Sequence, residues 1–328
     1  MPINMQTDSN LPQGGDIAVS SKSTSVSVNE APRFDQEFPH LYEETAYYLK
    51  QSPEDRVKFV HTDKFIVHEN AKTVLAAMKD IYNRPPGMVR PACLGVIGAS
   101  NEGKTATAKR FFRDLGGDPA RFFGNHDEMP VLCVEMPPRA TEPRICLSIA
   151  RALGLTGYGG AKARIVTDNV YRALVIKKVR VLILMEFQHV MPLPCSERQV
   201  VFDLVKGISN HGISIIAIGT EEAKRIMGED EQIANRMRIV RLKGFAKGQE
   251  FYNFLHSLEP YYPLPMPSGL SSPKLADEIY GRTNGITGEV VALCNAAAAY
   301  AIRHGKPCID KAVLTSATLF PAANVEAA

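Results

Sequence analysis

The sequence predicts an α/β fold in which a parallel five-stranded sheet lies between helices and is followed by a small C-terminal helical lid. Short, near-continuous aliphatic runs alternate with segments of helical periodicity, which is typical of a parallel sheet covered on both faces. A glycine-rich loop follows the first of these runs and precedes a predicted helix. Beyond Gly248 the remaining segments have helical patterns, so no further strand is expected there.

Five strands are expected from short aliphatic runs bounded by turn signals. They lie at 93–97, 131–134, 181–184, 213–218 and 237–242. Helical periodicity predicts helices between them at 105–115, 145–153 and 168–177. After the last strand, helices are expected at 249–258, 273–280 and 288–304.

The chain is expected to divide into four parts. Residues 1–33 are rich in Ser, Thr, Asn, Gln and Gly and predict a disordered N-terminal arm. Residues 34–247 are expected to form the main domain, which begins with a helical extension over 34–83. Residues 248–320 are expected to form the lid subdomain, and residues 321–328 a frayed tail.

The composition is that of an ordinary folded protein. The 328 residues are 45% hydrophobic and 22% charged, with a formal net charge of +3. These values exclude a wholly disordered, collagenous or coiled-coil chain, and any basic surface must be local. Neither a membrane span nor a secretory signal is predicted, so we expect a cytoplasmic protein without a membrane partner. The six cysteines form no CxxC pair and are expected to be reduced thiols, not zinc ligands or disulfides.

The strongest chemical signal is a complete G-x-x-x-x-G-K-[ST] motif between the first strand and the next helix. Its glycines allow successive N–H groups to face phosphate oxygens, its lysine reaches the β- and γ-phosphates, and its threonine offers a hydroxyl to Mg²⁺. The motif therefore predicts a site for ATP with Mg²⁺, and the sequence holds no [NT]KxD motif for reading guanine. The expected nucleotide ligands are Gly98, Ala99, Ser100, Asn101, Glu102, Gly103, Lys104, Thr105 and the nearby Thr107.

A second acidic site is expected at the end of the third strand, where Met185 and Glu186 follow four aliphatic residues. Two acids normally stand at this place in a P-loop ATPase, one for Mg²⁺ and one that polarises the attacking water. Met185 cannot coordinate Mg²⁺, which prefers oxygen ligands. Glu186 either acts as the base and reaches Mg²⁺ through water, or is an ordinary carboxylate at a strand end. The sequence supports nucleotide binding better than fast hydrolysis.

Two further side chains are expected to act on the γ-phosphate. Thr220 follows the fourth strand and can hydrogen-bond the γ-phosphate or the attacking water. Arg236, just before the fifth strand, can project into the nucleotide of a neighbouring subunit as an arginine finger. Arg238 is the second choice for that role. Alternatively, Arg236 is an ordinary surface arginine without a catalytic role.

The aromatic Phe65 precedes the P-loop strand in the sequence. It is expected to pack on the adenine together with Ile66 and Val67, unless these side chains belong to the core.

In their order and spacing, these motifs resemble an AAA+ ATPase, and more specifically the TniB/TnsC family of transposition ATPases, relatives of MuB. The resemblance covers about residues 40–315. The segments that carry it, besides the P-loop, are 134–138, 185–186, 219–223, 230–237, 255–259, 263–265, 268–270 and 285–289.

The resemblance implies an ATP-dependent regulator of transposition that binds double-stranded DNA largely without sequence preference. Such proteins assemble as rings or helical filaments, with a hexamer-like arrangement, recruit the transposase and disassemble on ATP turnover. Related systems work with a TniQ-type targeting protein, and some with CRISPR effectors, so a nucleoid-associated bacterial protein is expected. The chain departs from the family at Met185. It also lacks an arginine in the lid motif around Gly288, so Gly288 is expected to sense nucleotide through its backbone and packing.

The resemblance places DNA contacts between the second and third strands. This stretch is basic and has few acids, which suits phosphate contacts that do not read bases. Alternatively, each of these residues belongs to a solvent-exposed basic surface and does not contact DNA. The candidates are Arg139, Arg144, Arg151, Lys162 and Arg164.

Two other functions stay open at this point. A helicase-loader-type AAA+ protein would share the motifs, although the segments 136–138 and 263–265 disfavour it. A nucleotide-binding scaffold with little hydrolysis would account for Met185.

Overall fold

The computed structural model describes residues 33–85, 91–117, 129–156 and 163–317. Residues 1–32 of the predicted arm and the predicted tail lie outside this range. So do Lys162 and the glycines at 157–160.

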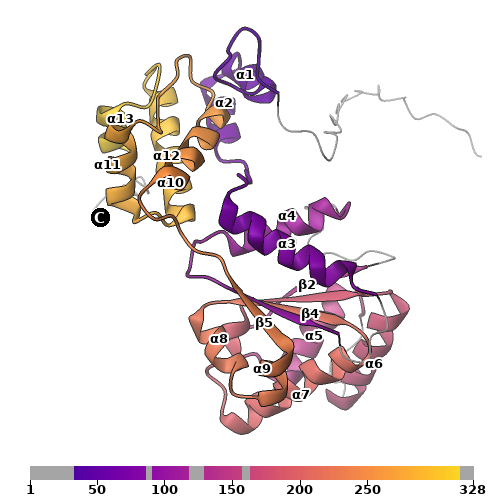
Figure 1. The fold of residues 1–328 in the computed structure, drawn as a ribbon. Helices are drawn as coiled ribbons and strands as arrows, with labels where there is room; N and C mark the ends of the chain where they lie inside the picture. The colour runs from indigo at the N-terminus through magenta and orange to yellow at the C-terminus, as the bar shows by residue number, and fades with distance from the viewer. Residues whose placement is uncertain (1–32, 86–90, 118–128, 157–162, 318–328) are drawn as a thin grey trace, which may run out of the picture.

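The centre of the molecule is a five-stranded parallel sheet with the order β2-β3-β4-β1-β5 (Figure 1). All five predicted strands are present within one residue of their expected ends. The strands are β1 (Cys93–Ile97), β2 (Val131–Glu135), β3 (Val181–Met185), β4 (Ser214–Gly219) and β5 (Met237–Arg241). Four of the five are buried along nearly their whole length, which explains why they read as continuous aliphatic runs.

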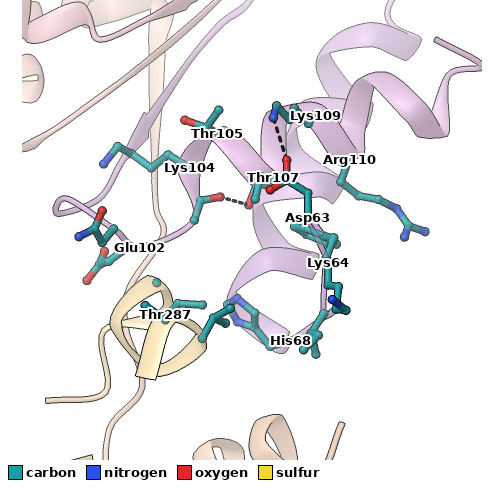
Figure 2. Close-up of a pocket in the computed structure, with 18 of the residues that line it drawn as sticks. Asp63, Lys64, His68, Glu102, Lys104, Thr105, Thr107, Lys109, Arg110 and Thr287 are labelled. Carbon is teal, nitrogen blue, oxygen red and sulfur yellow. Dashed lines mark hydrogen bonds and ion pairs between the residues drawn. The ribbon is translucent and has the colours of Figure 1, made fainter. Parts of the chain in front are cut away.

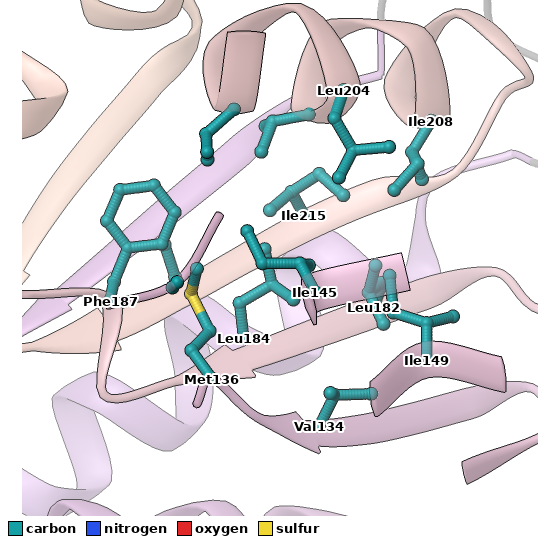
Figure 3. Packing of buried hydrophobic residues seen from close by; sticks show 14 of the residues in the cluster. Val134, Met136, Ile145, Ile149, Leu182, Leu184, Phe187, Leu204, Ile208 and Ile215 are labelled. Atoms are coloured by element: carbon teal, nitrogen blue, oxygen red, sulfur yellow. The ribbon is translucent and has the colours of Figure 1, made fainter. Parts of the chain in front are cut away.

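Helices cover both faces of the sheet, as the sequence predicts. One face carries α3 (Glu69–Asn83) and α4 (Lys104–Asp114). The other carries α5 (Glu142–Ala152), α6 (Ala163–Ile176) and α7 (Cys195–Asn210). Successive strand residues alternate between the faces: Leu184 packs with Ile145 and Leu204 under α5 and α7 (Figure 3), whereas Ile183 packs under α3 and α4.

Several helices differ from the sequence prediction. The expected helical stretch 34–83 forms three helices, α1 (Glu43–Leu49), α2 (Pro53–Val60) and α3. Helix α2 begins anew after α1 because Ser52 caps its N-terminus and Pro53 fits the first helical position. Helix α5 begins before Ile145, since Pro143 is also tolerated in a first turn. Within the described ranges, four α-helices were not predicted: α7, α8 (Glu221–Met227), α9 (Glu231–Arg236) and α13 (Lys311–Ser316).

The C-terminal helices form a separate apolar cluster. They are α10 (Gln249–Leu258), the 3-10 turn η3 (Glu259–Tyr261), α11 (Pro273–Thr283), α12 (Thr287–Arg303) and α13. Val60 at the end of α2 belongs to the same cluster, so the N-terminal extension packs against these helices, and Figure 1 shows α1 and α2 beside them.

Among the described helices, none is by itself long and apolar enough to cross a membrane. Only α11 and α12 taken together pass such a test, and they are bent by 119° at the break between them.

Candidate nucleotide-binding site

The glycine-rich motif forms the turn between β1 and α4. Gly103 has φ 81° and Asn101 has φ 63°, both in the left-handed region that this curled loop requires. Gly98 is needed for a different reason, because a Cβ there would lie 2.7 Å from the carbonyl oxygen of Leu242. The motif thus curls tightly against the end of β5, with its backbone at the N-terminus of α4.

Two charged side chains hold the loop in shape. The Lys104 ammonium donates hydrogen bonds to the carbonyl oxygens of Gly98 (2.9 Å) and Ala99 (2.6 Å). Burial lowers the pKa of Lys104, and the carboxylates of Glu186 and Glu102 partly oppose this shift. The Glu102 carboxylate accepts hydrogen bonds from the Ala99 N–H (3.1 Å) and from the Gly244 N–H (2.9 Å). Glu102 therefore ties the loop to the chain segment that connects β5 to the C-terminal helices.

The loop opens into a cavity of about 920 Å³, a size that suits a nucleotide. Figure 2 shows walls from the glycine-rich loop, the segment before α3, α4 and the start of α12. Helix α10 also contributes to the lining. The Thr107 hydroxyl donates to the Gly103 carbonyl (2.9 Å) at the base of α4. Of the residues expected to bind nucleotide, those that line the cavity are Phe65, Ser100, Asn101, Glu102, Gly103, Lys104, Thr105, Thr107 and Gly288.

Part of the cavity lining is apolar. Phe65 and Ile66 line it together with Phe254 and Leu258 of α10, an arrangement that can enclose a flat base. Val67 is 43% exposed and lies outside the lining. Phe65 also packs against the cluster under α3 and α4, so it serves both the core and the cavity.

Two buried polar atoms at this cavity have no hydrogen-bond partner in the structure. They are His68 Nδ1 and Thr287 Oγ1, and both residues line the cavity. Buried polar groups are normally satisfied, so these two atoms indicate that the cavity fits a polar ligand. Sequence reasoning missed both, because a single histidine or threonine outside a motif gives no signal.

The glycine-rich loop also contacts the C-terminal helices through two hydrogen bonds. The Gly288 N–H donates to the Asn101 carbonyl (2.7 Å), and the Asn101 side-chain amide donates to Glu289 (2.9 Å). A residue of the glycine-rich loop thereby binds the first turn of α12.

The carboxyl end of β3 faces the same cavity. Glu186 has φ 58° directly after the strand and lines the cavity with Thr220. Gln188 connects the two residues, because its amide nitrogen donates to the Glu186 carboxylate and its amide oxygen accepts from the Thr220 N–H at 3.2 Å. Met185 is 2% exposed and packs in the core. Its thioether side chain has no oxygen atom that could bind Mg²⁺. Gln188 belongs to none of the motifs that the sequence predicts. Its position two residues after Glu186 was the signal that could have identified it.

Arg236 lies at a distance from this site. It ends α9 and lines a small pocket with Cys93 and Ser209, and its guanidinium donates a long hydrogen bond to Asn210 (3.5 Å). It does not line the nucleotide cavity of its own chain.

Four of the five candidate DNA contacts lie in the described part of the chain and are exposed. Arg139 lies in the bend before α5 and has φ 51°. Arg144 lies in the first turn of α5 and donates a hydrogen bond to the Pro138 carbonyl (2.6 Å). Arg151 is in the last turn of α5, and Arg164 is near the start of α6. Three of these four side chains therefore lie on two neighbouring helices, and Arg139 lies just before the first of them.

Solved structures of P-loop AAA+ ATPases have the same fold. The Aeropyrum pernix ORC2 protein in ADPNP–ADP complexes has a TM-score of 0.60 and 17% identity, covering 79% of this chain and 71% of that chain. Drosophila ORC bound to DNA has a TM-score of 0.53 and 14% identity, covering 97% and 70%. Domain III of DnaA from Thermotoga maritima has a TM-score of 0.51 and 12% identity, covering 76% and 91%.

The fold and the glycine-rich loop define the class: the chain has the fold of the P-loop AAA+ ATPases. None of the curated proteins compared with the sequence matches it. The model of the family described as "Bacterial TniB protein" matches residues 56–247, which is more than half of the chain. The protein belongs to the TniB family, a group of transposition-associated AAA+ ATPases.

Proposed function

We propose that the protein is an ATP-dependent regulator of DNA transposition that oligomerises on double-stranded DNA and recruits a transposase. The observation that carries the nucleotide part is the curled loop at α4, which opens into a large cavity holding two unpartnered polar atoms. Membership of the TniB family supports the DNA part. We further propose that residues 34–247 and 248–320 act as ATPase core and lid.

The residues present fit ATP with Mg²⁺. The N–H groups at the start of α4 bind phosphate oxygens, and Lys104 exchanges its two carbonyl contacts for the β- and γ-phosphates. The Thr105 hydroxyl, exposed at the cavity, would hold Mg²⁺ beside the phosphates. When bound, Mg²⁺ neutralises charge that develops on the phosphate oxygens.

For hydrolysis, Glu186 accepts the proton of the attacking water at its carboxylate. Gln188 holds that carboxylate in place and links it to Thr220, which lines the cavity and would hydrogen-bond the γ-phosphate. Arg236 completes the site of the neighbouring subunit as an arginine finger, a role that its distance from its own cavity supports. Assembly and hydrolysis are therefore coupled, because each site needs two chains.

The exposed arginines before and on α5 and near the start of α6, with Lys162, are proposed to contact DNA phosphates. Such contacts are independent of sequence and weaken as salt concentration rises. The transposase and a TniQ-type targeting protein are the proposed protein partners, following the family.

The test is binding of a labelled DNA duplex in ATP, a slowly hydrolysed ATP analogue, ADP and no nucleotide. Tight, salt-sensitive binding with a triphosphate only, lost in Lys104→Ala, is the expected result. Equal binding in all four conditions, or none, would contradict the proposal and leave a nucleotide-binding scaffold or a helicase-loader-type protein. Measurable ATPase activity that Glu186→Gln abolishes would exclude the scaffold.

A further inference from the structure

The end of β3 lacks the acid that normally serves Mg²⁺, because Met185 occupies its position. The neighbouring strand β2 ends at the same level of the sheet with an acid. Glu135 is the direct partner of Met185 in the parallel register of β2 and β3. Strands separated by about 4.8 Å bring paired side chains close together.

The alternation of β2 assigns Glu135 to the face of the sheet that carries the nucleotide loop, just beyond the residues that line the cavity. Residues of β2 alternate in the structure: Val131 and Cys133 pack under α3 and α4, whereas Leu132 and Val134 pack on the opposite face. Glu135 continues the first set by the two-residue period of a strand. Met185 belongs to that face as well, and so does α4, whose first two residues are Lys104 and Thr105.

Glu135 also differs from the rest of its strand. The four preceding residues of β2 are buried, whereas Glu135 is exposed. Within the described part of the chain, no hydrogen bond or ion pair engages its carboxylate. A carboxylate with free acceptor atoms therefore stands beside the position where the metal-binding acid is missing.

We propose that Glu135 replaces the missing acid at position 185 and holds Mg²⁺ through a metal-bound water. A glutamate is one methylene longer than an aspartate, which offsets part of the extra distance from the neighbouring strand. Mg²⁺ keeps several of its waters in such sites, so a carboxylate in the outer coordination shell is sufficient. This inference rests on the proposed nucleotide site, and it leaves Glu186 to act as the base alone.

The test compares the wild type with Glu135→Gln, which keeps the shape of the side chain and removes its charge. Binding of a fluorescent, slowly hydrolysed ATP analogue is titrated with Mg²⁺, and binding of Mn²⁺ to the same complex is followed by electron paramagnetic resonance. Loss of an outer-shell partner typically weakens metal binding 10- to 100-fold, so we expect the Mg²⁺ midpoint of Glu135→Gln to rise about tenfold. Nucleotide affinity in EDTA should stay within about twofold of the wild type.

Glu54→Gln, at an exposed position on α2, is the matched control and should leave the midpoint unchanged. Met185→Asp introduced into Glu135→Gln should restore the midpoint; if this double variant does not fold, the single variant decides. An unchanged Mg²⁺ midpoint in Glu135→Gln, or nucleotide binding by the wild type that is independent of Mg²⁺, would overturn the inference. Failure of the wild type to bind the analogue under any condition would instead overturn the proposed nucleotide site.

Discussion

Replacing Gly288 by alanine should disturb the contact between α12 and the glycine-rich loop. A Cβ at Gly288 would lie 2.6 Å from the Asn101 carbonyl oxygen and 3.0 Å from the Asn101 Cβ. The two segments would have to separate by roughly 0.8 Å or more to restore an ordinary contact distance. That movement stretches the hydrogen bond from the Gly288 N–H, which is 2.7 Å long in the structure.

The expected cost follows from three effects. Weakening the hydrogen bond costs about 1 kcal/mol, and forcing an extra methyl group into a packed contact costs about 1–3 kcal/mol. The better helix propensity of alanine returns up to ~1 kcal/mol. With the full ~1 kcal/mol of helix propensity returned, the closed contact is weakened by about 1–3 kcal/mol. Nucleotide that touches both segments should therefore bind roughly five- to 150-fold more weakly.

The assay is titration of a fluorescent ATP analogue, with thermal unfolding measured in parallel. Gly281→Ala is the matched control, since a Cβ at this position in α11 meets nothing within 4 Å. It should raise stability by up to ~1 kcal/mol and leave nucleotide affinity unchanged. Affinity of Gly288→Ala within twofold of the wild type, with the control behaving as expected, would refute the reasoning.

Two further substitutions test the framework around the site. Burial raises the pKa of Asp114, but hydrogen bonds from Lys79 and Arg110, each 2.7 Å long, outweigh it and hold that pKa below its ordinary value. Its contribution to stability is therefore complete above the unfolded-state pKa of about 3.9 and is lost as pH falls through the folded-state pKa. Urea unfolding at pH 7 and pH 3 should show a smaller loss of stability on acidification in Asp114→Asn than in the wild type, and an equal loss would contradict this account. The Glu259 carboxylate accepts hydrogen bonds from the N–H groups of residues 268–270 at 2.6, 2.9 and 2.8 Å. Glu259→Gln should therefore lower the free energy of unfolding by about 1–3 kcal/mol. A change below about 0.5 kcal/mol would show that the charge is not needed.

The strands and the glycine-rich loop were predictable because their signals are local. A buried parallel strand is a short aliphatic run, and the loop is one continuous motif of eight residues. The short helices α9 and α13 were missed because six residues carry little periodicity. Each is started by an aspartate, Asp230 or Asp310, whose side chain caps the first turn. Helices of this length are stabilised mainly by packing against the rest of the protein.

The sequence by itself determined the type of most elements and the chemistry of the phosphate-binding loop, because each depends on residues adjacent in the chain. Only the tertiary structure decided that Gly288 meets Asn101, that His68 and Thr287 share one cavity, and that Glu135 stands beside Met185. These pairs are separated by about 50 to more than 200 positions in the chain. Their contacts follow from the order and register of the strands and from the docking of α12, which no local pattern specifies.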